Sequence, residues 1–289
     1  MMSDPSYPDN ADEPGLKDKL FALLLYLLPH HLLSQLMHWV TRLEWPPLKN
    51  RLINAVARHY RIDMYLAEER DPEKYSNFNA FFTRALQADA RPLAQETGAV
   101  LSPVDGVVSQ AGKVEKEGRI FQAKGQFYSL EELLGGDTEL AARFDTGSFA
   151  TLYLSPRDYH RVHMPVSGTL TKTCYVPGKL FSVNGVTAEN VDRLFARNER
   201  LVCYFDTPVG PMAMILVGAM IVAGIETVWE GQVAPPPRQP VVRDYARLPE
   251  PVSLTKGEEM GRFKLGSTVI LLFPEGAVDW HRNYEAGTA

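Results

Sequence analysis

The sequence holds an acid, a base and a hydroxyl nucleophile at positions far apart along the chain. A Gly-Ser-Thr turn (266–268) stands between a basic, aromatic run and the strand-like run 269–273. Asp105 lies in an Asp-Gly turn, and His160 and His163 stand three residues apart after a strand-like segment. These residue types are the parts of a catalytic triad, in which geometry rather than chain order defines the roles.

The glycine before Ser267 is suited to a second kind of chemistry. A serine hydroxyl can attack its own preceding carbonyl only if the backbone leaves its preferred conformation, and glycine does so at the lowest steric cost. Plainer interpretations also fit, namely an ordinary turn at Ser267, a turn-forming Asp-Gly pair and solvated loop histidines. The Gly-x-Ser-x-Gly elbow of many hydrolases is absent around Ser267. Taken one by one, these residues leave the chemistry open.

Composition narrows the class of protein. The chain has 289 residues, 45% of them apolar and 22% charged, which is typical of a folded globular protein with one large or two small domains. The net charge of -5 argues against a general nucleic-acid binder. Cys174 and Cys203 lack the spacing of a zinc site, and we expect reduced thiols in the core.

The N-terminal part predicts helices that contact a membrane surface or pack on the main domain. Residues 1–14 are polar and acidic, unlike a signal peptide, and the apolar run 20–28 stops at Pro29, short of the roughly 20 residues that span a bilayer. From 15 to 61 the apolar residues follow a helical period. This segment carries a net charge of +5 and leaves -10 for the rest of the chain. An anionic membrane would attract such a segment, although plain packing explains the helices equally well.

Beyond residue 91 the pattern becomes that of short strands. Residues 99–108 predict two strands around the Asp105 turn, and 130–140 predict a helix. Further strands are expected at 149–154, at 202–205 and along 212–225, and a proline-rich loop at 234–240. The aromatic-rich helical turn 75–84 is interpreted as packing. The predicted fold class is α+β, with a helical N-terminal region for membrane association (1–90) followed by a β-rich, sandwich-like catalytic core (91–289).

Six segments form an ordered set of motifs. They are the run Gly-Arg-Phe-Lys-Leu-Gly-Ser-Thr-Val-Ile (261–270), the histidine loop 153–165, and the segments 78–84, 103–106, 178–184 and 194–200. This set resembles the motifs of the bacterial phosphatidylserine decarboxylases, the first as their processing site and the second as their histidine motif. The resemblance covers nearly the whole chain, from the leader helices to beyond Ser267.

The resemblance implies an enzyme that makes its own pyruvoyl cofactor. Asp105 would orient His163, and His163 would take the proton of Ser267, whose oxygen attacks the carbonyl of Gly266. The resulting ester undergoes β-elimination, and the dehydroalanine that remains hydrolyses to a pyruvoyl group with loss of ammonia. The products would be a large subunit (1–266) and a small, pyruvoyl-capped subunit (267–289).

The resemblance further implies decarboxylation of phosphatidylserine to phosphatidylethanolamine. The substrate amine would form a Schiff base with the pyruvoyl carbonyl, which accepts electrons as carbon dioxide leaves. His160 is expected to help decarboxylation and protonation, and Tyr153 to line the pocket. No metal is expected. The lipid substrate favours membrane contact by the leader, at the cytoplasmic face and without a spanning helix.

Two other functions are compatible with the sequence, and the sequence departs from the family pattern at one point. Ser267, His163 and Asp105 could form a lipid-ester hydrolase, or the chain could be a non-catalytic lipid-binding module, and both alternatives predict an uncleaved chain. The tail after Pro-Glu-Gly (274–276) is shorter than usual in the family, which would leave an edge of the core uncovered if it is truncated. The oligomeric state is open, a homodimer being one option.

Overall fold

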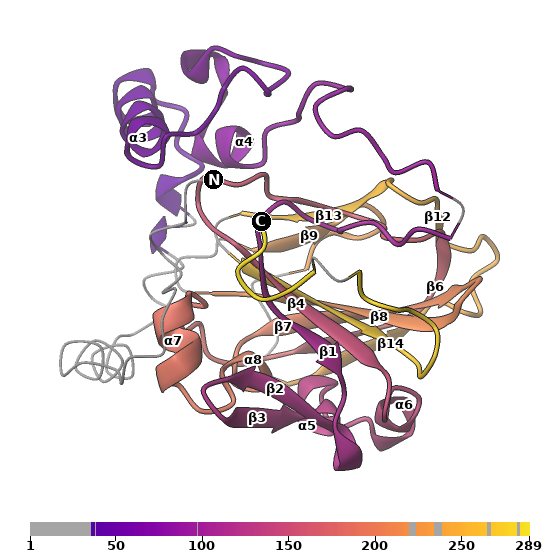
Figure 1. The fold of residues 1–289 in the computed structure, drawn as a ribbon. Coiled ribbons are helices and arrows are strands. Elements are labelled where there is room, and N and C mark those ends of the chain that lie inside the picture. The colour runs from indigo at the N-terminus through magenta and orange to yellow at the C-terminus, as the bar shows by residue number, and fades with distance from the viewer. Residues whose placement is uncertain are drawn as a thin grey trace.

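The fold is described from a computed structural model, which places residues 36–37, 39–96, 98–219, 224–233, 239–264, 267–281 and 284–289. The apolar run 20–28, most of the proline-rich loop and the two residues before Ser267 lie outside the described residues. Figure 1 shows a β-rich core with a small helical region at one end. The predicted α+β class, with helices preceding a β-rich core, is confirmed.

The core is built on a large antiparallel sheet of eight strands. In order across the sheet these are β1 (Val107–Lys113), β4 (Ser148–Leu154), β14 (Ser267–Phe273), β8 (Gly210–Val217), β7 (Arg200–Thr207), β6 (Gly168–Val176) and β11 (Val241–Asp244), with β12 (Ser253–Leu254) also paired to β6. The last strand in the chain, β14, therefore lies in the interior of the sheet between β4 and β8.

Smaller elements cover the two faces of this sheet (Figure 1). A four-stranded sheet contains β10 (Gly231–Gln232), β9 (Ile225–Thr227), β13 (Glu259–Phe263) and β5 (Arg161–His163). The other face is covered by the hairpin β2 (Arg119–Ala123) and β3 (Gln126–Ser129) and by the short helices α5 (Leu130–Leu133), α6 (Thr138–Ala142), α7 (Gly185–Asn190) and α8 (Leu194–Arg197). The described residues also contain two short 3₁₀ helices, η1 (Pro72–Lys74) and η2 (Lys116–Gly118).

The apolar run of β14 is continuous because both of its faces are buried. Ile270 and Leu272 belong to the core on the helix-covered side, whereas Val269, Leu271 and Phe273 belong to the core beneath the four-stranded sheet. Successive side chains of a strand point to opposite faces, so a strand between two layers needs apolar residues at every position. The free thiols of Cys174 and Cys203 are likewise buried, one in each core.

The N-terminal region forms a separate small cluster. Helix α3 (Pro46–His59) begins with two prolines, which suit a first helical turn. Helix α4 (Phe78–Phe82) is capped by the preceding Asn77, whose side chain accepts a hydrogen bond from the Ala80 amide at 3.0 Å. Phenylalanines of α4 pack against Ile53 of α3. Trp39 and Trp45 lie outside this cluster, 63% and 64% exposed. Within the placed residues, no helix has the length and apolar character needed to cross a bilayer.

Three details of the strand and helix predictions were wrong. Residues 99–104 form no strand, and the first strand begins at Val107, after the Asp105 turn. The segment 130–140 contains two short helices, because Gly135 and Gly136, with φ of +79° and +90°, end the first of them. The stretch 212–225 is likewise divided between β8 and β9.

Gly106, next to Asp105, is the position where the turn tolerates no side chain. Its φ is +147°, and an added Cβ would lie 2.2 Å from the carbonyl oxygen of Tyr153. We expect Gly106→Ala to lower the free energy of unfolding by more than about 2 kcal/mol, because backbone strain and a clash with the β4 backbone add together. Urea denaturation followed by tryptophan fluorescence measures the change.

Gly125→Ala is the matched control. Gly125 also has a positive φ, +75°, but an added Cβ would meet nothing within 4 Å. Its substitution tests strain alone, which costs about 1–2 kcal/mol. Equal losses in the two variants would contradict the clash with β4.

Candidate active site

Ser267 is the first residue of β14 and lies where the strands β4, β14 and β8 end in the interior of the large sheet. It faces Leu154, the last residue of β4, while Thr268 faces Val217, the last residue of β8. The Ser267 side chain is fully buried, and its hydroxyl has no hydrogen-bond partner among the described residues. Buried polar atoms are nearly always paired, so the free hydroxyl makes Ser267 a candidate functional residue, although several other buried hydroxyls, among them that of Thr268, also have no described partner.

The loop that follows β4 forms a tight turn held by Asp158. Its carboxylate accepts hydrogen bonds from the amide and the hydroxyl of Ser155 at 2.7 and 2.8 Å. Burial raises the pKa of Asp158, and these two hydrogen bonds partly oppose that increase. The turn therefore fixes the direction in which the chain continues toward His160.

His160 lies buried at the end of this turn, next to the edge where Ser267 begins β14. Its Nε2 is 3.0 Å from the carbonyl oxygen of Ser155, the residue after the partner of Ser267 in β4. Its own carbonyl accepts the Phe263 amide at 3.0 Å. His160 thus contacts the residue after β4 and the last residue of β13. The short segment that joins β13 to β14 ends with Gly266, whose carbonyl carbon is bonded to the nitrogen of Ser267.

The hydrogen bond to Ser155 determines the tautomer of His160. A carbonyl oxygen only accepts, so Nε2 carries the hydrogen. Burial, and next the charge of Arg84, lower the pKa of His160 from 6.5 to about 3. The neutral ring therefore has its lone pair on Nδ1, which is buried and has no partner among the described residues. The site offers a proton acceptor beside the start of β14.

Asp105 and His163 line a cavity of about 460 Å³ outside the four-stranded sheet. Apolar side chains make up much of its wall, among them Leu86, Leu93 and Val104. His163 projects from β5 on the side opposite Val162, whose side chain lies in the core. Sequence reasoning placed both residues in one site, and they do share this cavity.

Within the cavity each of the two residues is bonded to another partner. The Arg91 guanidinium donates to both oxygens of Asp105, at 2.8 and 2.5 Å. The Nδ1 of His163 donates to the carbonyl of Gly257 at 2.8 Å, and in the neutral ring Nε2 accepts from the hydroxyl of Tyr159 at 3.1 Å. Among the placed residues, no hydrogen bond joins His163 to Asp105 or to Ser267.

Tyr153 lies on the other side of the large sheet from Ser267. Its side chain is buried in the helix-covered core, and its backbone pairs with Thr268 and with Val107. Ser267 instead shares the face of Val269, which belongs to the opposite core.

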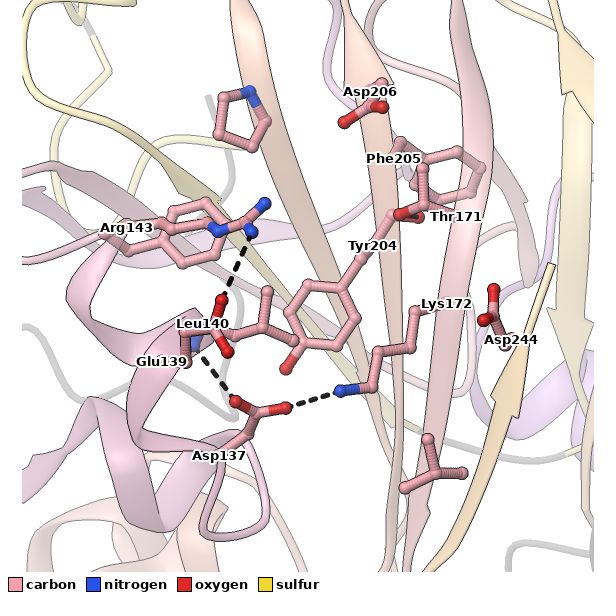
Figure 2. Close-up of a pocket in the computed structure, with 13 residues that line it drawn as sticks. Asp137, Glu139, Leu140, Arg143, Thr171, Lys172, Tyr204, Phe205, Asp206 and Asp244 are labelled. Atoms are coloured by element: carbon pink, nitrogen blue, oxygen red, sulfur yellow. Dashed lines mark hydrogen bonds and ion pairs between the residues drawn. The ribbon is translucent and has the colours of Figure 1, made fainter. Parts of the chain in front are cut away.

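A second cavity, of about 390 Å³, lies between β6, β7 and α6. Figure 2 shows that four of its charged residues form two pairs: Lys172 binds Asp137 at 2.5 Å, and Arg143 lies 3.8 Å from Glu139. None of the described residues that line it is a histidine, a serine or a cysteine. The chemistry-bearing residues of the sequence therefore gather elsewhere.

Sequence reasoning missed the roles of several residues that contact the two histidines or Asp105. Among them are Phe82, Arg91, Tyr159 and Gly257. The aromatic run 75–84 was assigned to packing, and an arginine or a tyrosine in a loop carries no signal of its partner. Only the tertiary contacts identify these residues.

The buried, neutral state of His160 predicts a loss of stability in mild acid. The unfolded chain takes up a proton near pH 6.5, whereas the folded chain does so only near pH 3, so stability is full above 6.5 and falls as the pH drops. This one group should cost about 2 kcal/mol of unfolding free energy at pH 5, at about 1.4 kcal/mol per pH unit. Urea denaturation between pH 7.5 and 5 measures it.

His160→Phe should remove this component of the pH dependence, whatever its effect on stability at pH 7.5. His59→Asn, a change at an exposed histidine of α3, is the control and should keep the full dependence. An unchanged pH dependence in His160→Phe would show that His160 is not the group responsible.

Comparison with known proteins assigns the family. The family model described as phosphatidylserine decarboxylase matches residues 78–287, and a model described as PSD matches residues 20–61. The chain is 62% identical to a phosphatidylserine decarboxylase proenzyme of Azotobacter vinelandii over 92% of its own length and 93% of that protein. It is 58% identical to the proenzyme of Alcanivorax borkumensis, over 95% and 94% of the two chains, and 62% identical to that of Pseudomonas aeruginosa strain LESB58, over 90% of each. The chain belongs to the phosphatidylserine decarboxylase family.

Proposed function

We propose that this protein decarboxylates phosphatidylserine to phosphatidylethanolamine, using a pyruvoyl group that it makes from its own Ser267. The observation that carries the proposal is the buried, unpartnered hydroxyl of Ser267 at the start of β14, in a chain that is about 60% identical to proteins named as proenzymes. The word proenzyme describes those relatives, and processing of this chain is our inference from it.

The residues around Ser267 fit a pyruvoyl group. The group is no larger than the serine residue from which it forms, and Ser267 is held at a buried strand end whose hydroxyl is not needed for any described hydrogen bond. When formed, a pyruvoyl group supplies a carbonyl that binds the substrate amine and draws electrons away as carbon dioxide leaves. The interior sheet position of β14 would keep the small subunit (267–289) attached after cleavage, since it pairs with both β4 and β8.

For self-cleavage we propose that Ser267 is the nucleophile, His163 the base and Asp105 the residue that orients the base. The hydroxyl oxygen attacks the Gly266 carbonyl while its proton passes to His163, and the ester formed is then eliminated. His163 is bonded to Tyr159 and Asp105 to Arg91 in this structure. The triad therefore requires His163 and Asp105 to exchange partners, and His163 to turn from the outer cavity toward Ser267, before cleavage.

For the decarboxylation itself we propose His160 as the proton-transfer residue. Its neutral ring presents an unpartnered Nδ1 at the end of the Ser155 turn, next to the edge where Ser267 begins β14. A substrate ammonium must lose a proton before its nitrogen can attack a carbonyl, and a carbon centre must gain one after carbon dioxide has left. An imidazole at this place is the proposed carrier of both protons, and its pKa of about 3 means that substrate binding must raise its basicity before it accepts the first one. The sequence also predicted Tyr153 as a pocket residue, but its side chain lies in the opposite core, and no part in this step is proposed for it.

We propose that the N-terminal region (1–90) docks the core (91–289) on an anionic membrane at the cytoplasmic face. Trp39, Trp45 and Leu36 are exposed on this region, and aromatic and leucine side chains suit a headgroup boundary. The region is also tied to the site: Arg42 donates to Gln232 at 2.5 Å, and the same amide oxygen accepts from Lys264, two residues before Gly266, at 3.3 Å.

Intact mass spectrometry under denaturing conditions tests self-cleavage. Wild type should give two chains, the smaller one starting at position 267 with a pyruvoyl group, and Ser267→Ala should give one chain. His163→Ala and Asp105→Ala should slow cleavage by about 100-fold or more, because the hydroxyl then has no oriented base. Rapid cleavage of purified His163→Ala would rule out this base.

His160→Ala separates the two reactions. It should cleave as wild type does but lose phosphatidylserine decarboxylation by about 100-fold or more, measured as carbon dioxide released from labelled lipid. A His160→Ala chain that fails to cleave would instead place His160 in the processing step.

Sedimentation with vesicles that contain phosphatidylglycerol tests membrane docking. Replacing both Trp39 and Trp45 by alanine should weaken binding about tenfold or more, because two exposed rings no longer enter the interface. Val242→Ala, at a residue 55% exposed on strand β11, is the matched control and should bind normally. Equal binding of all three proteins would place the docking surface elsewhere.

A further inference from the structure

The segment that ends α4 contacts the histidine loop through consecutive residues. The ring of Phe82 stacks on the ring of His160, with centroids 4.0 Å apart and planes 26° from parallel. The carbonyl of Thr83 accepts a hydrogen bond from Arg161 Nε at 3.0 Å. These two contacts hold His160 and the start of β5 against the N-terminal region.

Arg84, the next residue, binds the turn that precedes His160. Its Nη2 donates to the carbonyls of Arg157 and Asp158, at 3.2 and 3.4 Å. The side chain is only 4% exposed, and its guanidinium lies 5.8 Å from the centre of the Phe81 ring. Three successive residues, Phe82 to Arg84, therefore contact His160 and the residues on both sides of it.

Comparison with Arg200 shows that Arg84 is more than a packing residue. Arg200 is equally buried, and each of its three guanidinium nitrogens donates to at least one backbone carbonyl. In Arg84 the Nε and Nη1 nitrogens have no partner among the described residues, and no carboxylate there forms an ion pair with it. Burial lowers the pKa of Arg84, and the carboxylates of Asp105 and Asp158 act on its charge without forming an ion pair with it. Such a buried charge acts strongly on the groups around it, because little solvent screens its field.

We propose that Arg84 is a positioning residue for His160: it ties the Ser155 turn to the N-terminal region, and together with burial its charge disfavours protonation of the imidazole, which leaves Nδ1 open. The proposal rests on the function proposed above for His160. It assigns Arg84 to proton transfer through His160, without contact between Arg84 and the reacting atoms.

The charged groups around His160 support this assignment. The charged group of the segment after α4 that acts on His160 is Arg84. Burial is the main cause of the low pKa of His160, and the charge of Arg84 is the second. On its own loop, Asp158 is bonded to Ser155 and lies 3.6 Å from Arg157, while burial keeps Tyr159 protonated by raising its pKa to about 12. From the β13 side, Phe263 contributes a backbone amide, and the nearby Lys264 is paired with Glu226 at 2.7 Å.

Histidine NMR of the full-length protein tests the proposal without an activity assay. The signal of His160 is assigned by its absence from His160→Asn, and its proton uptake is followed from pH 8 to the acid limit of the fold. Arg84→Gln removes the charge but keeps an amide that can donate to the loop carbonyls. We expect its His160 to take up a proton at least about 1 pH unit higher than in wild type, because the repelling cation is gone.

Arg157→Gln is the matched control, since it removes a cation from the loop itself where the side chain is 39% exposed. It should leave the titration of His160 unchanged to within about 0.3 pH unit, because solvent screens an exposed charge. A folded Arg84→Gln whose His160 titrates as in wild type would overturn the proposal. Failure of both Arg84→Gln and Arg84→Lys to fold would also overturn it, in favour of a purely structural role.

Kinetics in mixed micelles of phosphatidylserine provide the second readout. Arg84→Gln should cleave itself as wild type does and lose kcat about tenfold with KM changed less than about twofold, and the acid limb of its kcat should move to higher pH. Arg84→Lys, which keeps the charge, should restore the pH profile. Absence of decarboxylation in wild type would refute the proposed function, whereas the NMR titration would still decide the electrostatic role of Arg84.

Discussion

The burial of β14 on both faces is the constraint on which the rest of this structure depends. A strand of seven buried residues between β4 and β8 cannot slip by one position, because every side chain would then move to the opposite core. The fixed register places Ser267 opposite Leu154, where β4 ends and the Ser155 turn begins. Packing far from the site thereby fixes the position of Ser267, the proposed nucleophile.

Several polar groups at the Ser155 turn and at the start of β14 are buried without partners among the described residues. Ser267 Oγ, His160 Nδ1 and two nitrogens of Arg84 each lack a described hydrogen bond, and an unpaired buried group costs about 1–3 kcal/mol. The two cores of the sandwich and the fully bonded Arg200 supply stability elsewhere. Such local cost is typical of catalytic sites, where atoms must stay available for substrate.

The two histidines of the loop serve different proposed steps because β5 begins between them. His160 precedes the strand and is sealed between Phe82 and the Ser155 turn, whereas His163 lies within the strand and projects into the cavity that Asp105 lines. Their spacing of three residues indicated a pair. One ring is buried because the Ser155 turn holds His160 before the strand begins. The other faces the cavity because successive side chains of a strand point to opposite sides.

The sequence by itself determined the fold class, the apolar strand after Ser267 and the set of residues suited to chemistry, because periodicity, turn residues and ordered motifs are local properties. It did not determine the contacts among those residues. The absence of a strand at 99–104 and the partners Arg91, Tyr159 and Arg84 were decided only in the tertiary structure. These features depend on which distant segments meet, and a backbone carbonyl or a guanidinium carries no sequence signal of its partner. The free hydroxyl of Ser267 is likewise a consequence of its burial, which only the packed sheet reveals.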